Sequence, residues 1–233
     1  TQYKAQYYND PSNPEGAGIK KEYFQYYDKA NLGQKNGHWY IRGERLNVFA
    51  AIDFAFSLKK DADYSTVVVI GMDADRFIYV LDIERFRTDK IKEYFEAVQR
   101  AHIKWGFRKL RAETTAGQKV IVKELKSQYI QKEGLAVAID EHSPSRSSGS
   151  KEERLDATLR PQYENLSVYH YRGGNCEILE EELLAEHPPH DDIKDALMCA
   201  IDVAVPPTIG QRHRRKVGNN VIPFHPKFGG VAA

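Results

Sequence analysis

The 233-residue sequence has only two cysteines, Cys176 and Cys199, which are too few and too far apart for a metal-binding knuckle. Such sparse cysteine fits a reducing compartment. Long apolar runs are also missing. None approaches the roughly 20 residues that a helix needs to cross a bilayer, and the polar first residues do not resemble a secretion signal. We therefore expect neither a membrane protein nor a secreted one.

A large charge of either sign is absent as well, because the formal net charge is +1 at pH 7. This balance argues against wholesale attraction to nucleic acid, so any basic surface must be local. The dense basic run at 212–216 lies in a Gly- and Pro-punctuated tail that we expect to be flexible. With 41% apolar and 29% charged residues, the chain is typical of a globular protein with a full core.

The order of apolar patterns predicts an α/β fold. Helical spacing marks two helices before the last third of the chain, at 91–105 and 120–130. Alternating or Val-rich runs mark the strands, with turn residues between them. The five predicted strands are 46–56, 65–72, 77–83, 109–113 and 135–140.

Connections between these segments predict the topology of the sheet. The first three strands follow one another through short turns and form an antiparallel meander. The later strands are joined through helices, which favours parallel pairing with right-handed crossovers. The result is a five-stranded mixed sheet flanked by helices, with a hairpin or loop insertion before the last helix. This is the ribonuclease H-like arrangement, in which the first strand lies beside the fourth and the last helix packs across both.

Three carboxylates open the last predicted helix. Asp191, Asp192 and Asp195 follow Pro188 and Pro189, which prevent an earlier start of the helix. The helix dipole tolerates negative charge in its first turn, yet Asp195 shares a face with both other acids and repels them. A divalent cation would reverse that repulsion.

Two further acids end predicted strands. Asp53 interrupts a run that otherwise reads as a buried strand, where Asp is depleted. A desolvated carboxylate costs several kcal/mol unless protonation, an arginine or a metal neutralises it. Glu113 ends the strand 109–113 and alone would be an ordinary solvated residue. The predicted topology brings both ends to the start of the last helix, and this coincidence favours one site.

Such a site suits phosphodiester hydrolysis by two Mg²⁺ or Mn²⁺ ions, the hard cations that carboxylates select. On this interpretation Asp53 bridges both ions, because the central strand is the most rigid support. Glu113 binds one ion, and Asp192 with Asp195 binds the other. Asp191 substitutes for a ligand or orients water.

Four segments of the sequence resemble the C-terminal nuclease domain of the large terminase subunit of tailed double-stranded DNA bacteriophages. The resemblance covers about residues 46–205. It rests on Asp53 with the segment 63–66, Glu113 with Gly117, the segment 151–155 before Arg160, and the acid-rich segment 190–197. The last of these is the most specific.

The resemblance implies a metal-dependent endonuclease that cuts concatemeric viral DNA during genome packaging in the cytoplasm of an infected bacterium. It implies double-stranded DNA as substrate, with an N-terminal ATPase domain, a portal and a small terminase subunit as partners. The family's acids carry over to Asp53, Glu113 and Asp192 with Asp195, and the register between Asp191 and Asp192 stays open.

The same resemblance divides the chain. Residues 1–46 correspond to the linker and tail of a missing ATPase domain, residues 47–206 to the nuclease domain, and residues 207–233 to the basic tail. The sequence has no Gly-x-x-x-x-Gly-Lys-Ser/Thr loop, so we expect no ATP hydrolysis by this chain. The first residue, Thr1, is not methionine, which fits excision from a longer protein.

Three basic residues after the Ser-rich segment 142–150 are candidates for DNA contacts. Lys151, Arg154 and Arg160 would hold phosphates without reading the base sequence, and a near-neutral chain should grip DNA weakly. Two alternatives stay open. One is another ribonuclease H-like enzyme, such as a Holliday-junction resolvase or a transposase-type recombinase. The other is a DNA- or portal-binding module whose acids hold a structural ion.

Overall fold

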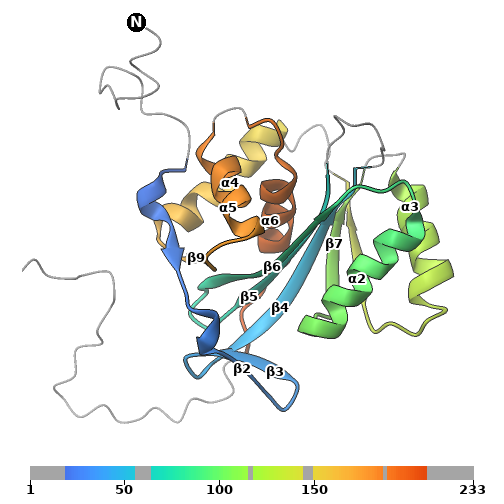
Figure 1. The fold of residues 1–233 in the computed structure, drawn as a ribbon, viewed down its shortest axis with the longest axis horizontal. Helices are drawn as coiled ribbons and strands as arrows, with labels where there is room; N and C mark the ends of the chain where they lie inside the picture. The colour runs from blue at the N-terminus through green and yellow to red at the C-terminus, as the bar shows by residue number, and fades with distance from the viewer. Residues whose placement is uncertain (1–18, 56–63, 115–117, 144–148, 186–187, 209–233) are drawn as a thin grey trace, which may run out of the picture.

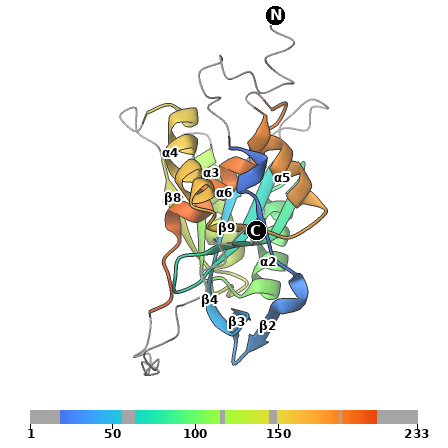
Figure 2. The same cartoon turned by 90° about the vertical axis from the view of Figure 1, so that its left-hand side faces the viewer.

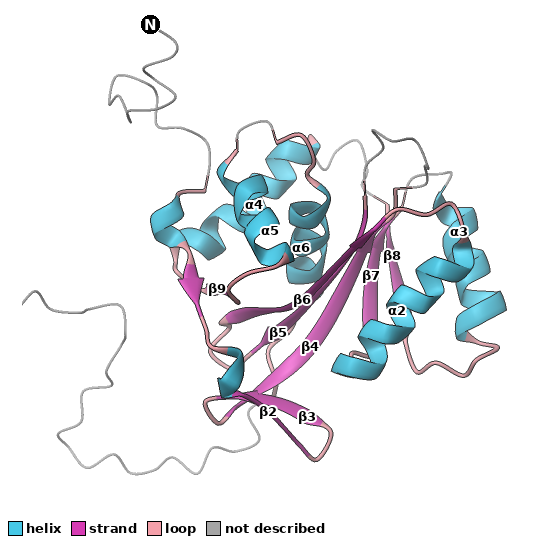
Figure 3. Cartoon of the chain, viewed as in Figure 1, coloured by secondary structure: helices cyan, strands magenta, loops and turns pink. Residues whose placement is uncertain are grey.

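The computed structural model describes residues 19–55, 64–114, 118–143, 149–185 and 188–208. These parts of the chain build one mixed sheet of nine strands with helices against both faces (Figures 1 and 3). Short 3₁₀ turns, η1 (Lys21–Tyr23) and η2 (Lys29–Asn31), precede the hairpin at one end of the sheet.

The centre of the sheet is β4 (Glu44–Asp53). It pairs antiparallel with β5 (Ser65–Met72) and parallel with β7 (Lys109–Glu113). Outside these strands, β6 (Ile78–Phe86) runs antiparallel to β5, and β8 (Ala138–His142) runs parallel to β7. This is the predicted five-strand order, and the ribonuclease H-like mixed sheet is confirmed.

Four short strands extend the predicted sheet. β2 (Leu32–Lys35) and β3 (His38–Ile41) form a hairpin that continues antiparallel from β4. At the other edge, β9 (Val168–His170) pairs parallel with both β6 and β1 (Gln25–Tyr26). Residues 25–46 therefore contribute strands to the same sheet as the ribonuclease H-like core. Their derivation from an ATPase domain stays a prediction, as does the tail, of which 209–233 lie outside the described residues.

Helices cover the two faces of the sheet differently (Figure 1). One face carries α2 (Ile91–Trp105) and α3 (Gln118–Glu124), which continues as the π-helical turn η3 (Leu125–Ile130). The other carries the last helix, α6 (Asp192–Val203), with two further helices, α4 (Lys151–Glu164) and α5 (Asn175–Leu184). None of the described helices combines the length and apolarity that a membrane crossing needs.

The predicted hairpin or loop insertion is wrong, because α4, β9 and α5 occupy most of that stretch. The sequence signal for α4 is a capping box at its start. Ser150 accepts from the backbone N–H of Glu153, whose carboxylate accepts from the N–H of Ser150. The buried residues of α4 are Leu155, Leu159 and Tyr163, too few to produce a strong amphipathic pattern.

Packing between α6 and the sheet is close because the buried face of α6 contains Ala196 and Ala200, both with no exposed surface. Beneath it, every residue of β5 is buried, as expected for a Val-rich strand covered on both faces. The first turn of α6 is thereby held against the ends of the central strands.

Gly71 offers a test of side-chain packing on the opposite face of the sheet from α6. A Cβ at Gly71 would lie 2.9 Å from Leu46 Cδ1 and 3.3 Å from Leu81 Cδ1, and both leucines are buried. We expect Gly71→Ala to lower the free energy of unfolding by about 1–3 kcal/mol through overpacking. Gly33→Ala is the matched control, because nothing lies within 4 Å of its added Cβ. Equal denaturant midpoints for the two variants would contradict the described packing.

Candidate active site

Three predicted acids line one pocket. Because β4 and β7 are parallel neighbours, their last residues, Asp53 and Glu113, lie at the same end of the sheet. The first turn of α6 brings Asp195 to the same place. The pocket has a volume of about 140 Å³ and is lined by Asp53, Glu113, Gln118, Lys151, Arg154, Asp195, Met198 and Cys199.

The chain beyond Asp53 is tied to both helices of the opposite face. The backbone carbonyl of Phe54 accepts a hydrogen bond from Gln118 Nε2 at 2.7 Å. The next carbonyl, of Ala55, accepts from the hydroxyl of Tyr94 at 3.0 Å. Asp53 is thus placed by hydrogen bonds on its C-terminal side and by the sheet on its N-terminal side.

Two cations of α4 form ion pairs with acids of the site. Arg154 donates to both carboxylate oxygens of Glu113, at 2.9 and 2.8 Å. Lys151 forms ion pairs with Asp195 and with Asp191, the latter at 2.8 Å. Sequence reasoning assigned these cations to DNA phosphates and missed their contacts with the acids, because the path of α4 was not predicted.

Asp192 does not line the pocket. Its Oδ2 accepts from the backbone N–H of Tyr64 at 3.2 Å and from Arg85 at 3.1 Å, and its side chain is buried. Arg85 also stacks on the ring of Tyr64, 3.8 Å from its centroid. Of the helix acids, Asp195 therefore lines the pocket together with Asp53, while Asp191 is linked to Asp195 through Lys151. Arg160, the third predicted DNA contact, pairs with Asp156 at 2.6 Å; the phosphate-binding role of all three cations stays a prediction.

The charges of the acids are set by burial and by these pairs. Burial raises the pKa of Asp53 to about 8, with Asp195 adding to the rise and Lys151 opposing it. Burial also raises the pKa of Asp195 to about 6, against the charge of Lys151. For Glu113, burial acts upwards, but the hydrogen bonds and charge of Arg154 leave its pKa below the ordinary value.

These acids fit a hard divalent cation. Asp195 Oδ1 is buried without a hydrogen-bond partner, and the Asp53 carboxylate has no hydrogen bond to any described residue. Both are oxygen donors whose negative charge is incompletely balanced, the donor type that Mg²⁺ and Mn²⁺ prefer. Lys151 and Arg154 now balance part of the negative charge of these acids. A bound metal cation would have to take the place of their ammonium and guanidinium groups.

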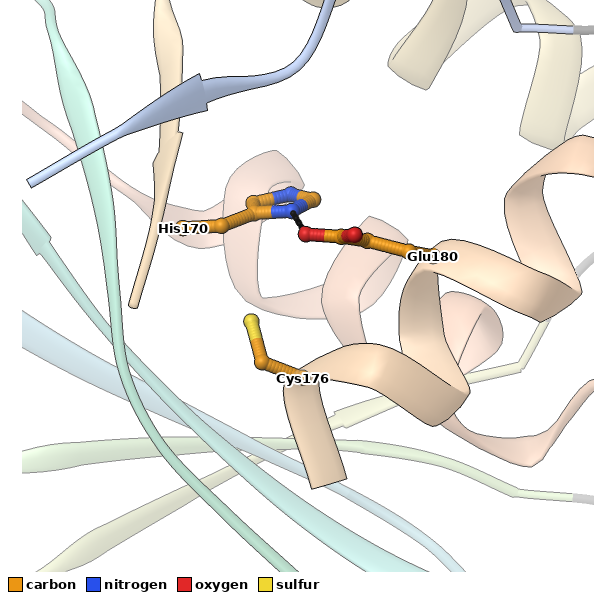
Figure 4. A group of neighbouring side chains, drawn as sticks. All are labelled: His170, Cys176 and Glu180. Atoms are coloured by element: carbon orange, nitrogen blue, oxygen red, sulfur yellow. Dashed lines mark hydrogen bonds and ion pairs between the residues drawn. The ribbon is translucent and has the colours of Figure 1, made fainter. Parts of the chain in front are cut away.

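A second cluster has closer spacing but different chemistry. In the described parts of the chain, one group of three possible metal ligands lies within 4.8 Å of one another: His170, Cys176 and Glu180 (Figure 4). The acids of the pocket do not form such a group. Yet His170 hydrogen-bonds Glu180 at 3.0 Å and the Tyr163 hydroxyl at 2.8 Å, and burial raises the pKa of the Cys176 thiol to about 12. The cluster is a satisfied hydrogen-bond network joining β9, α4 and α5.

Comparison with known proteins supports the fold. The chain is similar to the crystal structure of the large terminase nuclease from thermophilic phage G20c, with a TM-score of 0.53 and 18% identity over 79% of this chain and 96% of that one. The same nuclease with bound magnesium gives a TM-score of 0.54 and 16% identity over 78% and 94%. For the P22 large terminase nuclease domain, the TM-score is 0.49 and the sequence identity is 17%, over 77% of this chain and 87% of that one.

No protein-family model matches the sequence, and no curated protein matches it significantly. The fold and the pocket together define a ribonuclease H-like domain with carboxylates at the ends of its central strands. Within that fold, the chain is similar to the nuclease domains of phage large terminases, at identities that establish the fold alone.

The raised pKa of Asp53 predicts a pH-dependent stability. An unfolded Asp titrates near 4, so between about pH 4 and 8 the folded state binds the extra proton, and stability falls as pH rises through this window. We expect Asp53→Asn to gain stability relative to wild type by about 1–3 kcal/mol between pH 5 and pH 8 in EDTA. Urea denaturation at each pH measures it.

The control is Asp202→Asn, which removes an exposed carboxylate from α6. A stability difference between wild type and Asp53→Asn that stays constant from pH 5 to pH 8 would contradict the assigned environment of Asp53.

Proposed function

We propose that this chain is a metal-dependent nuclease that hydrolyses phosphodiester bonds in double-stranded DNA, with the acid-lined pocket as its active site. The observation that carries the proposal is the convergence of Asp53, Glu113 and Asp195 from β4, β7 and α6 on one pocket. The ribonuclease H-like fold and its similarity to terminase nucleases support the same chemistry.

Each acid has a proposed part in holding two Mg²⁺ or Mn²⁺ ions. Asp53 would contribute to both ion positions, Glu113 to one of them and Asp195 to the other. Asp192 supports this second position from its pair with Arg85, and Asp191 orients water. When bound, the ions activate the attacking water and stabilise the leaving 3′ oxygen.

Lys151 and Arg154 change partners in this proposal. In the described structure both side chains form ion pairs with acids. The nitrogen–oxygen distance is 2.8 Å in the Lys151–Asp191 pair and in the Arg154–Glu113 pair. Metal ions would take over that charge balance and release both side chains. They line the pocket from the start of α4, where they would then hold the phosphates that flank the cut.

The finer proposal is a role in viral DNA packaging. Here the chain cuts concatemeric double-stranded DNA in an infected bacterium, as part of a protein with an N-terminal ATPase domain, alongside a portal and a small terminase subunit. Its sequence motifs and its fold support this assignment. The net charge of +1 gives the chain little intrinsic hold on DNA, which suits an enzyme whose partners deliver the substrate.

Plasmid cleavage tests the activity. We expect nicking and linearisation of supercoiled DNA in Mn²⁺, abolished by EDTA and reduced at least about 1,000-fold by Asp53→Asn, which removes a charged metal ligand. Asp195→Asn should lose a comparable amount. Glu96→Gln, which changes a partly exposed acid on α2, is the control and should cut like wild type.

Substrate choice separates the alternatives. Preference for a four-way junction over plasmid would favour a resolvase. If Asp53→Asn processes DNA as the wild type does, the result would support a binding module with a structural ion and would exclude the proposed active site.

Metal binding has a separate readout in thermal stability. A ligand that binds only the folded state at 100 times its dissociation constant adds about 2.7 kcal/mol. We expect saturating Mn²⁺ to raise the melting temperature of wild type by several degrees and that of Asp53→Asn much less. An equal rise in both proteins would place the ion elsewhere.

A further inference from the structure

A second cleft lies at the opposite end of β4 from Asp53. The β2–β3 hairpin lies near the C-terminal end of α2 (Figures 1 and 2). Residues of β3, β4 and the end of α2 line a cleft of about 300 Å³ there. From Asn47 in this cleft to Asp53 is six residues along β4, or about 20 Å. Its lining is Gly37, His38, Trp39, Arg45, Leu46, Asn47, Val48, Phe49, Trp105, Gly106, Arg108 and Lys109.

The charge of this cleft is one-sided. None of its lining residues is acidic, and four of them are basic. Arg45 and Arg108 are exposed, and neither side chain has an ion pair or hydrogen bond to any described residue. Lys109 is partly committed, through a 3.1 Å pair with Asp140. Two guanidinium groups are therefore available to an anion, in a chain whose overall charge is nearly balanced.

Beside these cations lies a fixed aromatic surface. Trp39 is partly exposed, and its Nε1 donates to the backbone carbonyl of Trp105 at 3.0 Å. The two rings pack with centroids 4.7 Å apart, and the Nε1 of Trp105 donates to Asp82 at 2.7 Å. Both indoles are thus oriented by hydrogen bonds, and Trp39 lines the same cleft as Arg45 and Arg108.

A planar ring and free guanidinium groups together match a nucleotide. We propose that this cleft binds an unpaired nucleotide of single-stranded DNA, with the base stacked on Trp39 and the adjoining phosphates on Arg45 and Arg108. Stacking needs an exposed base face, which a duplex does not offer, and the volume lies at the lower end of that of small-ligand sites. An acidic peptide would engage the cations but would leave the indole without a matched partner.

Tryptophan fluorescence reports on this cleft alone, because Trp39 and Trp105 are the two tryptophans of the sequence. The experiment titrates the full chain with an oligonucleotide of eight thymidines. EDTA is present to prevent cleavage by a metal-dependent site. We expect saturable quenching whose affinity falls with salt, at a slope of about −1.4 in log–log form for two phosphate contacts.

Arg45→Gln and Arg108→Gln should each weaken binding about tenfold and reduce the salt slope by about 0.7. Arg100→Gln, on α2 and paired with Glu84, is the matched control and should bind like wild type. Circular dichroism checks that each of these three arginine variants is folded.

Three results would overturn the proposal. They are no quenching by the oligonucleotide at millimolar concentration, equal binding by wild type and both arginine variants, and quenching by poly-glutamate but not by the oligonucleotide. The last result would assign the cleft to an acidic protein. None of these results depends on the acid pocket. The nuclease proposal can therefore be wrong while the nucleotide-binding proposal is right, and the nucleotide-binding proposal can be wrong while the nuclease proposal is right.

Discussion

Electrostatic repulsion among carboxylates at one end of the sheet is the constraint on which the site depends. Asp53, Glu113 and Asp195 are brought together by parallel pairing of β4 with β7 and by the close packing of α6. Buried like charges must be balanced or protonated. Lys151 and Arg154 supply part of that balance, while burial and the nearby charge of Asp195 raise the pKa of Asp53. This arrangement supports the proposal that the pocket binds cations.

The fold separates two chemistries along the same strand. The C-terminal end of β4 borders the pocket that contains the acids. Its N-terminal part borders a cleft that is lined by basic and aromatic residues and by no acidic residue. This separation explains how a chain with a net charge of +1 has two surfaces with opposite electrostatic character. If both proposals hold, one end of the sheet performs hydrolysis, and the other holds an unpaired segment of the nucleic acid.

Much of the core was predictable because its signals are local. Val-rich β5, the helix over 91–105 and the strand over 109–113 have the predicted bounds. Chain order then placed the acids at one end of the sheet, although their roles stay predictions. The rest depends on contacts distant in sequence. β1 and β9 have two and three residues, too short for periodicity, and the Arg85–Asp192 pair joins residues 107 positions apart. The second cleft likewise needs β3, β4 and α2 in place before its basic residues become neighbours.

The central claim is that the pocket binds metal in place of its lysine and arginine. Anomalous diffraction from crystals soaked in Mn²⁺ tests it most directly. The account predicts manganese peaks among Asp53, Glu113 and Asp195, with Lys151 and Arg154 turned away from the acids. Manganese absent from this pocket, with the Lys151–Asp195 and Arg154–Glu113 pairs intact, would contradict it.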